Sequence, residues 1–141
     1  MRGKNEIDLE NLKHPVAKSV NIAKDFPGFP EITNITYDLW YLQITIWFGN
    51  QKPPIYVRFD DVRGFRVLDE GDLCEFWSDC RPSGWLWEIE KGGWFDLESI
   101  RPGFLSGAQS KGLIKEYLIT GINDCISVIT GAEPEIFKPE Y

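Results

Sequence analysis

Carboxylates are the side chains of this chain with the clearest capacity for chemistry, and they gather in two short stretches. The stretch 69–75, DEGDLCE, carries four carboxylates in seven positions, and Asp79 follows soon after it. In GWLWEIEKGGW, Glu88 and Glu90 lie two residues apart, which places both on one face of a strand. A close carboxylate pair could act as general acid and base, whereas an acidic run could bind a cation or a basic protein.

The other reactive residues favour packing or solvent exposure over catalysis. His14, the only histidine, lies beside Pro15 without a nearby nucleophile, whereas a catalytic triad needs a base that a third group orients. Cys74 and Cys80 flank an aromatic residue on a predicted helix, a pattern typical of packing. DEGDLCE lacks the ligand spacing of an EF-hand loop, and the chain has no Cys-x-x-Cys and no histidine pair for zinc. We therefore expect no enzyme activity, no cofactor and no metal.

A short helix beginning near Asp69 accounts for part of the acidic run. After Leu68 the apolar period changes from two to that of a helix, with apolar side chains at i, i+3, i+4 and i+7, namely Leu73, Phe76, Trp77 and Cys80. Asp69 suits the N-cap, and Glu70 and Asp72 lie in the first turn, where the helix dipole favours negative charge. These three carboxylates therefore have a structural reason for their position.

The elements around these residues are predicted to be strands in hairpin order. Alternation with a period of two, with turn residues between the runs, indicates strands at 37–48, 55–69, 85–90, 115–130 (a hairpin) and near 136–137. Gly64 interrupts the second run, which indicates a bulge or bend. We predict one domain over 1–141, an α+β fold with a curved, mostly antiparallel sheet of about five or six strands and one or two short helices. Residues 1–36 form an irregular lead-in with room for a short helix, and 37–137 form the sheet-based body.

The composition of the chain narrows the class of partner. A net charge of −7 and a pI near 4.7 argue against a nucleic-acid binder, which needs a basic footprint, and against docking on anionic lipid. A basic protein is the natural partner, although the same acidity also keeps a protein soluble. The first 20 residues lack a secretory signal, no apolar run is long enough for a membrane helix, and three cysteines form no disulfide framework. We therefore expect a cytoplasmic protein.

The aromatic share of 14%, with six tryptophans, is high for a chain of this size. Three tryptophans surround the turn at 91–93. Trp85 and Trp87 are predicted on the strand face opposite Glu88 and Glu90, so they either fill the core or anchor a binding surface. The sequence leaves both alternatives open.

Three stretches, VRFDDVRGFRVLDEGDLCEFW, GWLWEIEKGGWFDLES and EYLITGINDCISVITGAEPEI, combine aromatics, turns and acids. In this pattern the chain resembles small bacterial immunity proteins of polymorphic-toxin and contact-dependent growth-inhibition systems, over about residues 37–137. The resemblance implies a cytosolic protein without enzyme activity that binds a cognate toxin domain and blocks it. Such toxins are often nucleases with basic active-site clefts.

The predicted contact residues follow from charge alone, since no toxin-contact residue can be carried over from the resemblance. We expect the toxin C-terminal domain to bind an acidic, aromatic-edged surface made of Asp60, Asp61, Asp69, Glu70, Asp72, Asp79, Glu88, Glu90, Trp94 and Asp96. The first alternative is a small-molecule-binding protein or enzyme with Glu88 or Asp69 in an aromatic pocket. The second is a subunit of a larger assembly that pairs through an edge strand near 135–138.

Overall fold

The computed structural model describes residues 15–49, 52–69, 84–104 and 113–139. Within these ranges the chain forms nine strands, one 3-10 helix and one α-helix. In chain order they are β1 (Val16–Ser19), η1 (Asn21–Asp25), β2 (Glu31–Tyr37), β3 (Tyr41–Trp47), β4 (Ile55–Asp60), β5 (Val62–Asp69), β6 (Leu86–Lys91), α2 (Trp94–Ser99), β7 (Lys115–Thr120), β8 (Asp124–Thr130) and β9 (Glu135–Phe137). The predicted α+β class, with mostly antiparallel strands and few helices, is confirmed.

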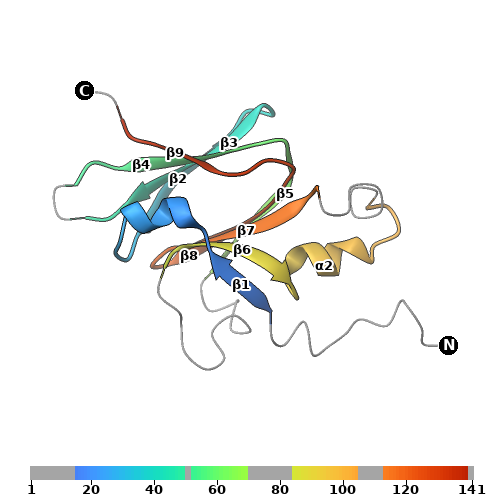
Figure 1. Ribbon diagram of the computed structural model, residues 1–141. Helices are drawn as coiled ribbons and strands as arrows, with labels where there is room; N and C mark the ends of the chain where they lie inside the picture. The colour runs from blue at the N-terminus through green and yellow to red at the C-terminus, as the bar shows by residue number, and fades with distance from the viewer. Residues whose placement is uncertain (1–14, 50–51, 70–83, 105–112, 140–141) are drawn as a thin grey trace.

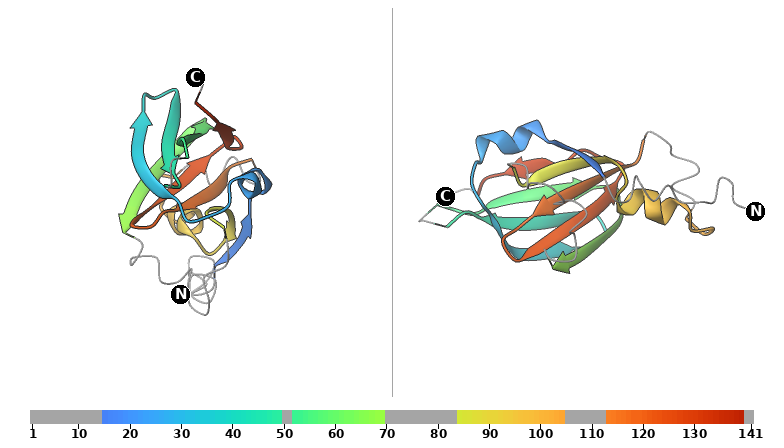
Figure 2. Two further views of the ribbon diagram at one scale, coloured as in Figure 1. Left: turned by 90° about the vertical axis from the view of Figure 1, so that its left-hand side faces the viewer. Right: turned by 90° about the horizontal axis from the view of Figure 1, so that it is seen from below.

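The strands form two sheets that stack face to face (Figure 1). One sheet has five strands in the order β1-β6-β7-β8-β5, and the other has four in the order β2-β3-β4-β9. All described pairs within both sheets are antiparallel. The α-helix α2 lies beyond one end of the sheets (Figure 2). The surface of the four-stranded sheet that points away from the other sheet is called the outer face below.

The main core fills the space between the two sheets. Alternate residues of β3 and β4 point inward and are buried, as their period of two predicts: Leu42, Ile44, Ile46, Ile55, Val57 and Phe59. They meet buried side chains of the five-stranded sheet, among them Leu86, Tyr117, Ile119, Ile126 and Val128. Because a face-to-face stack buries one face of each sheet, the other face of the four-stranded sheet remains available to solvent.

The five-stranded sheet is buried on its second face as well. Trp87, Ile89, Leu118 and Cys125 form a separate buried cluster there, against which Leu68 packs. Trp85 belongs to the main core, where its indole N–H donates to the carbonyl oxygen of Phe26 at 2.8 Å. Both tryptophans are therefore core residues, which decides between the two alternatives that the sequence leaves open. The alternation predicts Trp85 and Trp87 on one strand face. This prediction is wrong, because Trp85 precedes β6 and packs in the main core, whereas Trp87 packs on the other side of the sheet.

Two predicted strands are each divided by a turn. Within the run 37–48, β2 ends at Tyr37, residues 38–40 turn, and β3 begins at Tyr41. The strand β1, and β2 up to its last residue, lie within 1–36, where the sequence predicts an irregular lead-in. Pairing with β6 and β3 orders these stretches, although their local signal is weak. The predicted hairpin at 115–130 and the edge strand near 136–137 are confirmed as β7–β8 and β9. The helices predicted in the lead-in and after Asp69 lie outside the described residues.

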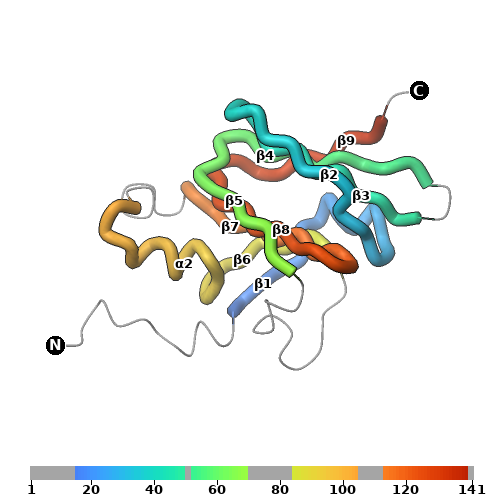
Figure 3. Tube along the Cα trace, turned by 180° about the vertical axis from the view of Figure 1, so that it is seen from behind, coloured from blue at the N-terminus to red at the C-terminus, as the bar shows by residue number. Residues whose placement is uncertain are grey.

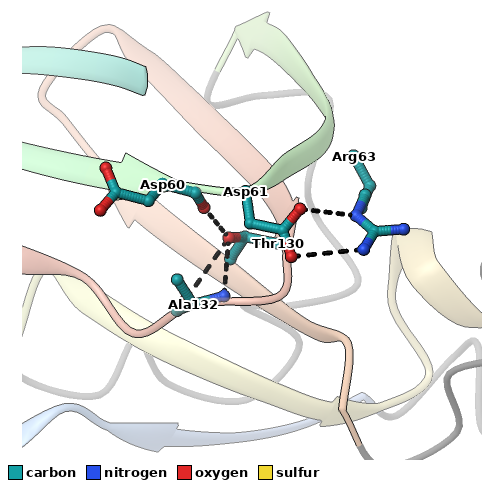
Figure 4. A network of polar contacts seen from close by, with 5 residues as sticks. All are labelled: Asp60, Asp61, Arg63, Thr130 and Ala132. Atoms are coloured by element: carbon teal, nitrogen blue, oxygen red, sulfur yellow. Dashed lines mark hydrogen bonds and ion pairs between the residues drawn. The ribbon is translucent and has the colours of Figure 1, made fainter. Parts of the chain in front are cut away.

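The second division lies at Asp61, where the chain passes from β4 in one sheet to β5 in the other (Figure 4). Asp61 has a φ of 48°, and its carbonyl oxygen accepts from the N–H of Gly131 at 3.0 Å. The hydroxyl of Thr130 donates to the carbonyl oxygen of Asp60 at 2.6 Å and accepts from the N–H of Ala132 at 3.1 Å. These bonds fix the bend that joins the two layers. The predicted irregularity at Gly64 follows as a register shift in the β5–β8 pair.

Candidate partner-binding surface

The outer face of the four-stranded sheet carries four aromatic side chains, called the aromatic face: Tyr41, Trp47, Tyr56 and Phe137. Register places them together, because residues directly opposite in antiparallel strands point to the same side. Tyr56 pairs with Phe137, and Tyr41 pairs with Asp60, whereas the inward residues pair with one another. Trp47 remains 43% exposed, and Tyr41 and Phe137 are also exposed. Aromatic side chains left in water on a sheet are typical of interface anchors.

Arg58 stiffens the middle of the aromatic face. Its guanidinium carbon lies 4.2 Å from the ring centroid of Tyr41 and 4.9 Å from that of Phe137. One terminal N–H also donates to the amide oxygen of Gln43 at 3.3 Å. Because one cation is held by two rings on different strands, the three side chains are ordered before any partner arrives.

The turn between β2 and β3, residues 38–40, is called the tip and projects beyond the neighbouring strands (Figure 3). Its two apolar side chains, Leu39 and Trp40, are 81% and 80% exposed. The carboxylate of Asp38 accepts from the N–H of Trp40 at 2.9 Å and from that of Tyr41 at 3.0 Å. These backbone bonds hold the pKa of Asp38 below its usual range, so the tip carries a full negative charge near neutral pH.

Four carboxylates border this surface and are called the rim acids: Glu31, Asp38, Asp60 and Glu135. Each lies at a strand end or in a turn, and Glu31 and Glu135 share the outer face with their partners Trp47 and Arg58. Among the described residues, none of the four forms an ion pair. Among the described residues of this surface, one guanidinium stands against four carboxylates, a balance that favours a negative potential around the aromatic centre.

The predicted acids within the described residues do not share one surface, and among them only Asp60 belongs to the rim. Asp61 forms an ion pair with Arg63 across 3.0 Å, next to the sheet crossing. Glu88 is held between Lys18 at 3.8 Å and Lys115 at 3.6 Å. Those two lysines offset its charge, and neither is its neighbour in sequence.

The other predicted residues that the structure describes also lie away from the outer face. Asp69 ends β5, Glu90 is exposed near the end of β6, and Asp96 accepts from the N–H of Gly92 at 2.7 Å. Trp94 is half-buried, with the guanidinium of Arg66 5.1 Å from its ring centroid. Glu70, Asp72 and Asp79 lie outside the described residues.

Sequence reasoning missed the aromatic face and the tip. The signal for the face was present, because the odd positions of 41–47 are Tyr, Gln, Thr and Trp, with no charged residue among them. The turn at the tip could not be recognised from its composition. Leu39 and Trp40 are apolar and continue the strand-like run, and neither is a usual turn residue.

Glu116 is the carboxylate with the most perturbed protonation. It is 1% exposed, and burial raises its pKa to about 7 although two backbone N–H groups and Arg66 act in the opposite direction. Its oxygens accept from the N–H of Phe95 at 2.8 Å and of Trp94 at 3.2 Å, at the first turn of α2. This geometry attaches α2 to β7, which is a structural role.

Two adjoining hollows bear on the alternative of a small-molecule binder. One, of about 310 Å³, is lined mainly by aromatic and proline side chains with Lys52 and Lys138 at its border. The other, of about 400 Å³, shares Phe26 and Pro27 with it and extends to Trp85. Neither Glu88 nor Asp69 lines them, so the carboxylates that the sequence proposes for a pocket lie elsewhere.

Comparison with protein-family models, with curated proteins and with solved structures gave no match to this chain. No helix within the described residues has the length and apolar character to cross a membrane. In the same part of the chain, no group of three or more His, Cys, Asp or Glu side chains could hold a metal ion. Function is therefore inferred from the surface itself.

Proposed function

We propose that this chain is an immunity protein that binds a cognate toxin domain through the outer face of its four-stranded sheet and blocks it. The observation that carries the proposal is the coincidence of exposed aromatic side chains and a stacked arginine on one sheet face, bordered by four acids that form no ion pair with any described residue. Tyr, Trp and Arg are the residue types that most often dominate binding energy at protein interfaces. A surface of this composition fits a protein partner.

The sign of the rim charge favours a basic partner. Carboxylates around an aromatic centre attract a positively charged cleft and speed association, up to about 10⁸–10⁹ M⁻¹s⁻¹ in strongly steered pairs. The aromatic face then supplies contact area that becomes desolvated. A nuclease toxin with a basic active-site cleft has the matching chemistry, and covering that cleft excludes its substrate. This action takes place in the cytoplasm of the protected cell and breaks no covalent bond.

The proposal is tested by co-expression with the candidate toxin domain encoded beside this chain's gene. The wild-type chain is expected to restore growth and to elute with the toxin domain as one complex from a sizing column. The double variant Asp60→Lys with Glu135→Lys reverses two rim charges, and we expect it to slow association markedly at low salt. Its matched control is Glu90→Lys with Asp124→Lys, which reverses two exposed acids of the five-stranded sheet.

The outcomes separate the outer face from a general effect of charge. Equal loss of binding in both double variants would show that net charge alone acts and would contradict the outer face as the site. No rescue of growth and no complex with the wild-type chain would contradict the immunity function itself.

A second candidate function is the binding of a small molecule in the hollow beside η1. The lining is mostly apolar and carries two lysines against one carboxylate, that of Asp25, which favours an apolar ligand with a negative group. Phe48→Trp adds volume at this hollow and changes none of the rim acids. If the wild-type chain gives no rescue of growth, while a long-chain carboxylate raises the unfolding midpoint of the wild-type chain but not that of Phe48→Trp, the second candidate is favoured over the first.

A further inference from the structure

We propose that the tip, residues 38–40, is an anchor that enters an apolar pocket of the toxin domain, at a place where lysine or arginine side chains border that pocket. This inference rests on the proposed function and adds to it which element is inserted and what the partner must offer.

The exposed side chains of the tip contribute little to the stability of the isolated protein. Leu39 and Trp40 leave about four-fifths of their surface in water, and the free fold gains almost no apolar burial from them. A Leu and a Trp side by side at the most projecting turn of a hairpin match the size and chemistry of interface anchors. Insertion into an apolar pocket would bury both side chains.

The backbone of the tip carries a cost that small residues would avoid. Leu39 has a φ of 75°, in the left-handed region that residues other than Gly, Asn and Asp rarely adopt. A left-handed Leu lowers the ratio of folded to unfolded protein by roughly 5- to 30-fold. Asn or Gly would relieve that cost, so an apolar residue held here indicates a role for its side chain.

The tip is also ordered before binding. The carboxylate of Asp38 accepts from two N–H groups of the turn, and its own N–H donates to the carbonyl oxygen of Tyr41 at 3.4 Å. Tyr41 in turn holds the guanidinium of Arg58. A loop fixed in this way loses little conformational entropy on association, which favours affinity.

The charges around the tip define the border of the partner's pocket. Asp38 lies in the tip, and Asp60 pairs with Tyr41 directly behind it. The hydrogen bonds to Asp38 keep its carboxylate ionised, so a partner that receives Leu39 and Trp40 must bring cationic groups to the border. A pocket bordered by Asp or Glu would be repelled.

The test compares two tip variants with two matched controls in binding to the toxin domain. Leu39→Asn keeps a residue that tolerates the left-handed conformation, and Trp40→Ala truncates the larger side chain. The controls are Ile122→Asn, in the turn between β7 and β8, and Phe29→Ala, whose ring is also 81% exposed. Each tip variant is expected to weaken binding by about 30-fold or more, whereas the controls change it by less than about threefold.

Thermal unfolding of the isolated chain supplies a readout that a structural role would not give. Leu39→Asn is expected to leave the midpoint unchanged or to raise it while it weakens the complex. A midpoint that falls below that of Ile122→Asn would show that Leu39 serves the free fold, and would overturn the inference. Wild-type chain labelled with 5-fluorotryptophan should show a shifted Trp40 resonance in the complex, assigned from Trp40→Phe.

Each remaining outcome decides between this inference and another. If neither tip variant changes the affinity of the complex, the tip is not an anchor, whereas the proposed function is unaffected. No complex with the wild-type chain overturns both. Dimers of the isolated chain that Trp40→Ala abolishes would assign the tip to a second copy. Binding of the wild-type chain, but not of Trp40→Ala, to phosphatidylcholine vesicles would assign it to a lipid surface.

Discussion

Raising the pH is expected to weaken the fold through one buried carboxyl group, that of Glu116. Burial raises its pKa from the usual 4.5 to about 7, so between these values the folded chain binds a proton that the unfolded chain releases. The free energy of unfolding falls with rising pH wherever the native state holds more protons. The contribution of Glu116 is therefore fully present below about pH 4.5 and is lost as the pH rises through about 7.

The size of the effect follows from the two pKa values. Each pH unit between them corresponds to about 1.4 kcal/mol, which gives about 2–3 kcal/mol between about pH 5 and about pH 8. Asp96 adds to the raised pKa by its charge, whereas Arg66 and the N–H groups of Trp94 and Phe95 oppose it. A loss of this size is a large fraction of the stability of a small domain.

Urea unfolding at both pH values measures this change, with Glu116→Gln as the matched control. The amide keeps an acceptor oxygen for α2 and does not titrate, so the difference between the two chains isolates Glu116 from all other groups. We expect the wild-type chain to lose about 2–3 kcal/mol more than the variant over this range. Curves for the two chains that stay parallel from about pH 5 to about pH 8 would refute the reasoning.

Two further substitutions test the contacts that fix the fold. Thr130→Val removes the hydroxyl that bridges Asp60 and Ala132 at the sheet crossing and is expected to cost about 1–3 kcal/mol in urea unfolding, whereas Thr130→Ser keeps the hydroxyl and most of the stability. Equal losses in the two variants would contradict the role of the hydroxyl. Gly93→Ala would bring a Cβ within 2.7 Å of both Glu116 Oε1 and Ile89 Cγ2, and should cost about 1–3 kcal/mol, whereas a Cβ at Gly103 meets nothing closer than 3.5 Å. A Gly93→Ala chain as stable as Gly103→Ala would show that the first turn of α2 has room to move.

The fold could be predicted from the sequence where one strand face is wholly apolar. The inward positions of β3 and β4 alternate without exception, and the turn at 121–124 separates two β-rich runs. The division at Asp61 could not be predicted in this way. It depends on Thr130 and Gly131, some 70 residues further along the chain. These residues donate hydrogen bonds to the carbonyl oxygens of Asp60 and Asp61, and they reach the bend only in the folded protein.

The candidate site was harder to predict because charge in a sequence does not show its partners. The sequence predicts a solvent-exposed, unpaired Glu88, yet Lys18 and Lys115 approach it from the neighbouring strands on both sides. The rim acids are scattered from 31 to 135 and come together only through the order of the sheet. Exposed aromatics on the odd face of β3 were the one local sign of the surface that the fold presents.

Phe137, one of the two rings that hold the guanidinium of Arg58, belongs to β9, the shortest strand that the structure describes. Three residues on a sheet edge offer few hydrogen bonds, so this strand should fray more readily than β3 or β4. When it frays, Phe137 leaves the guanidinium and Glu135 leaves the rim in the same event. The preformed arrangement of the outer face therefore depends on the local opening of β9. Hydrogen exchange of the amide protons of β9 would measure that opening.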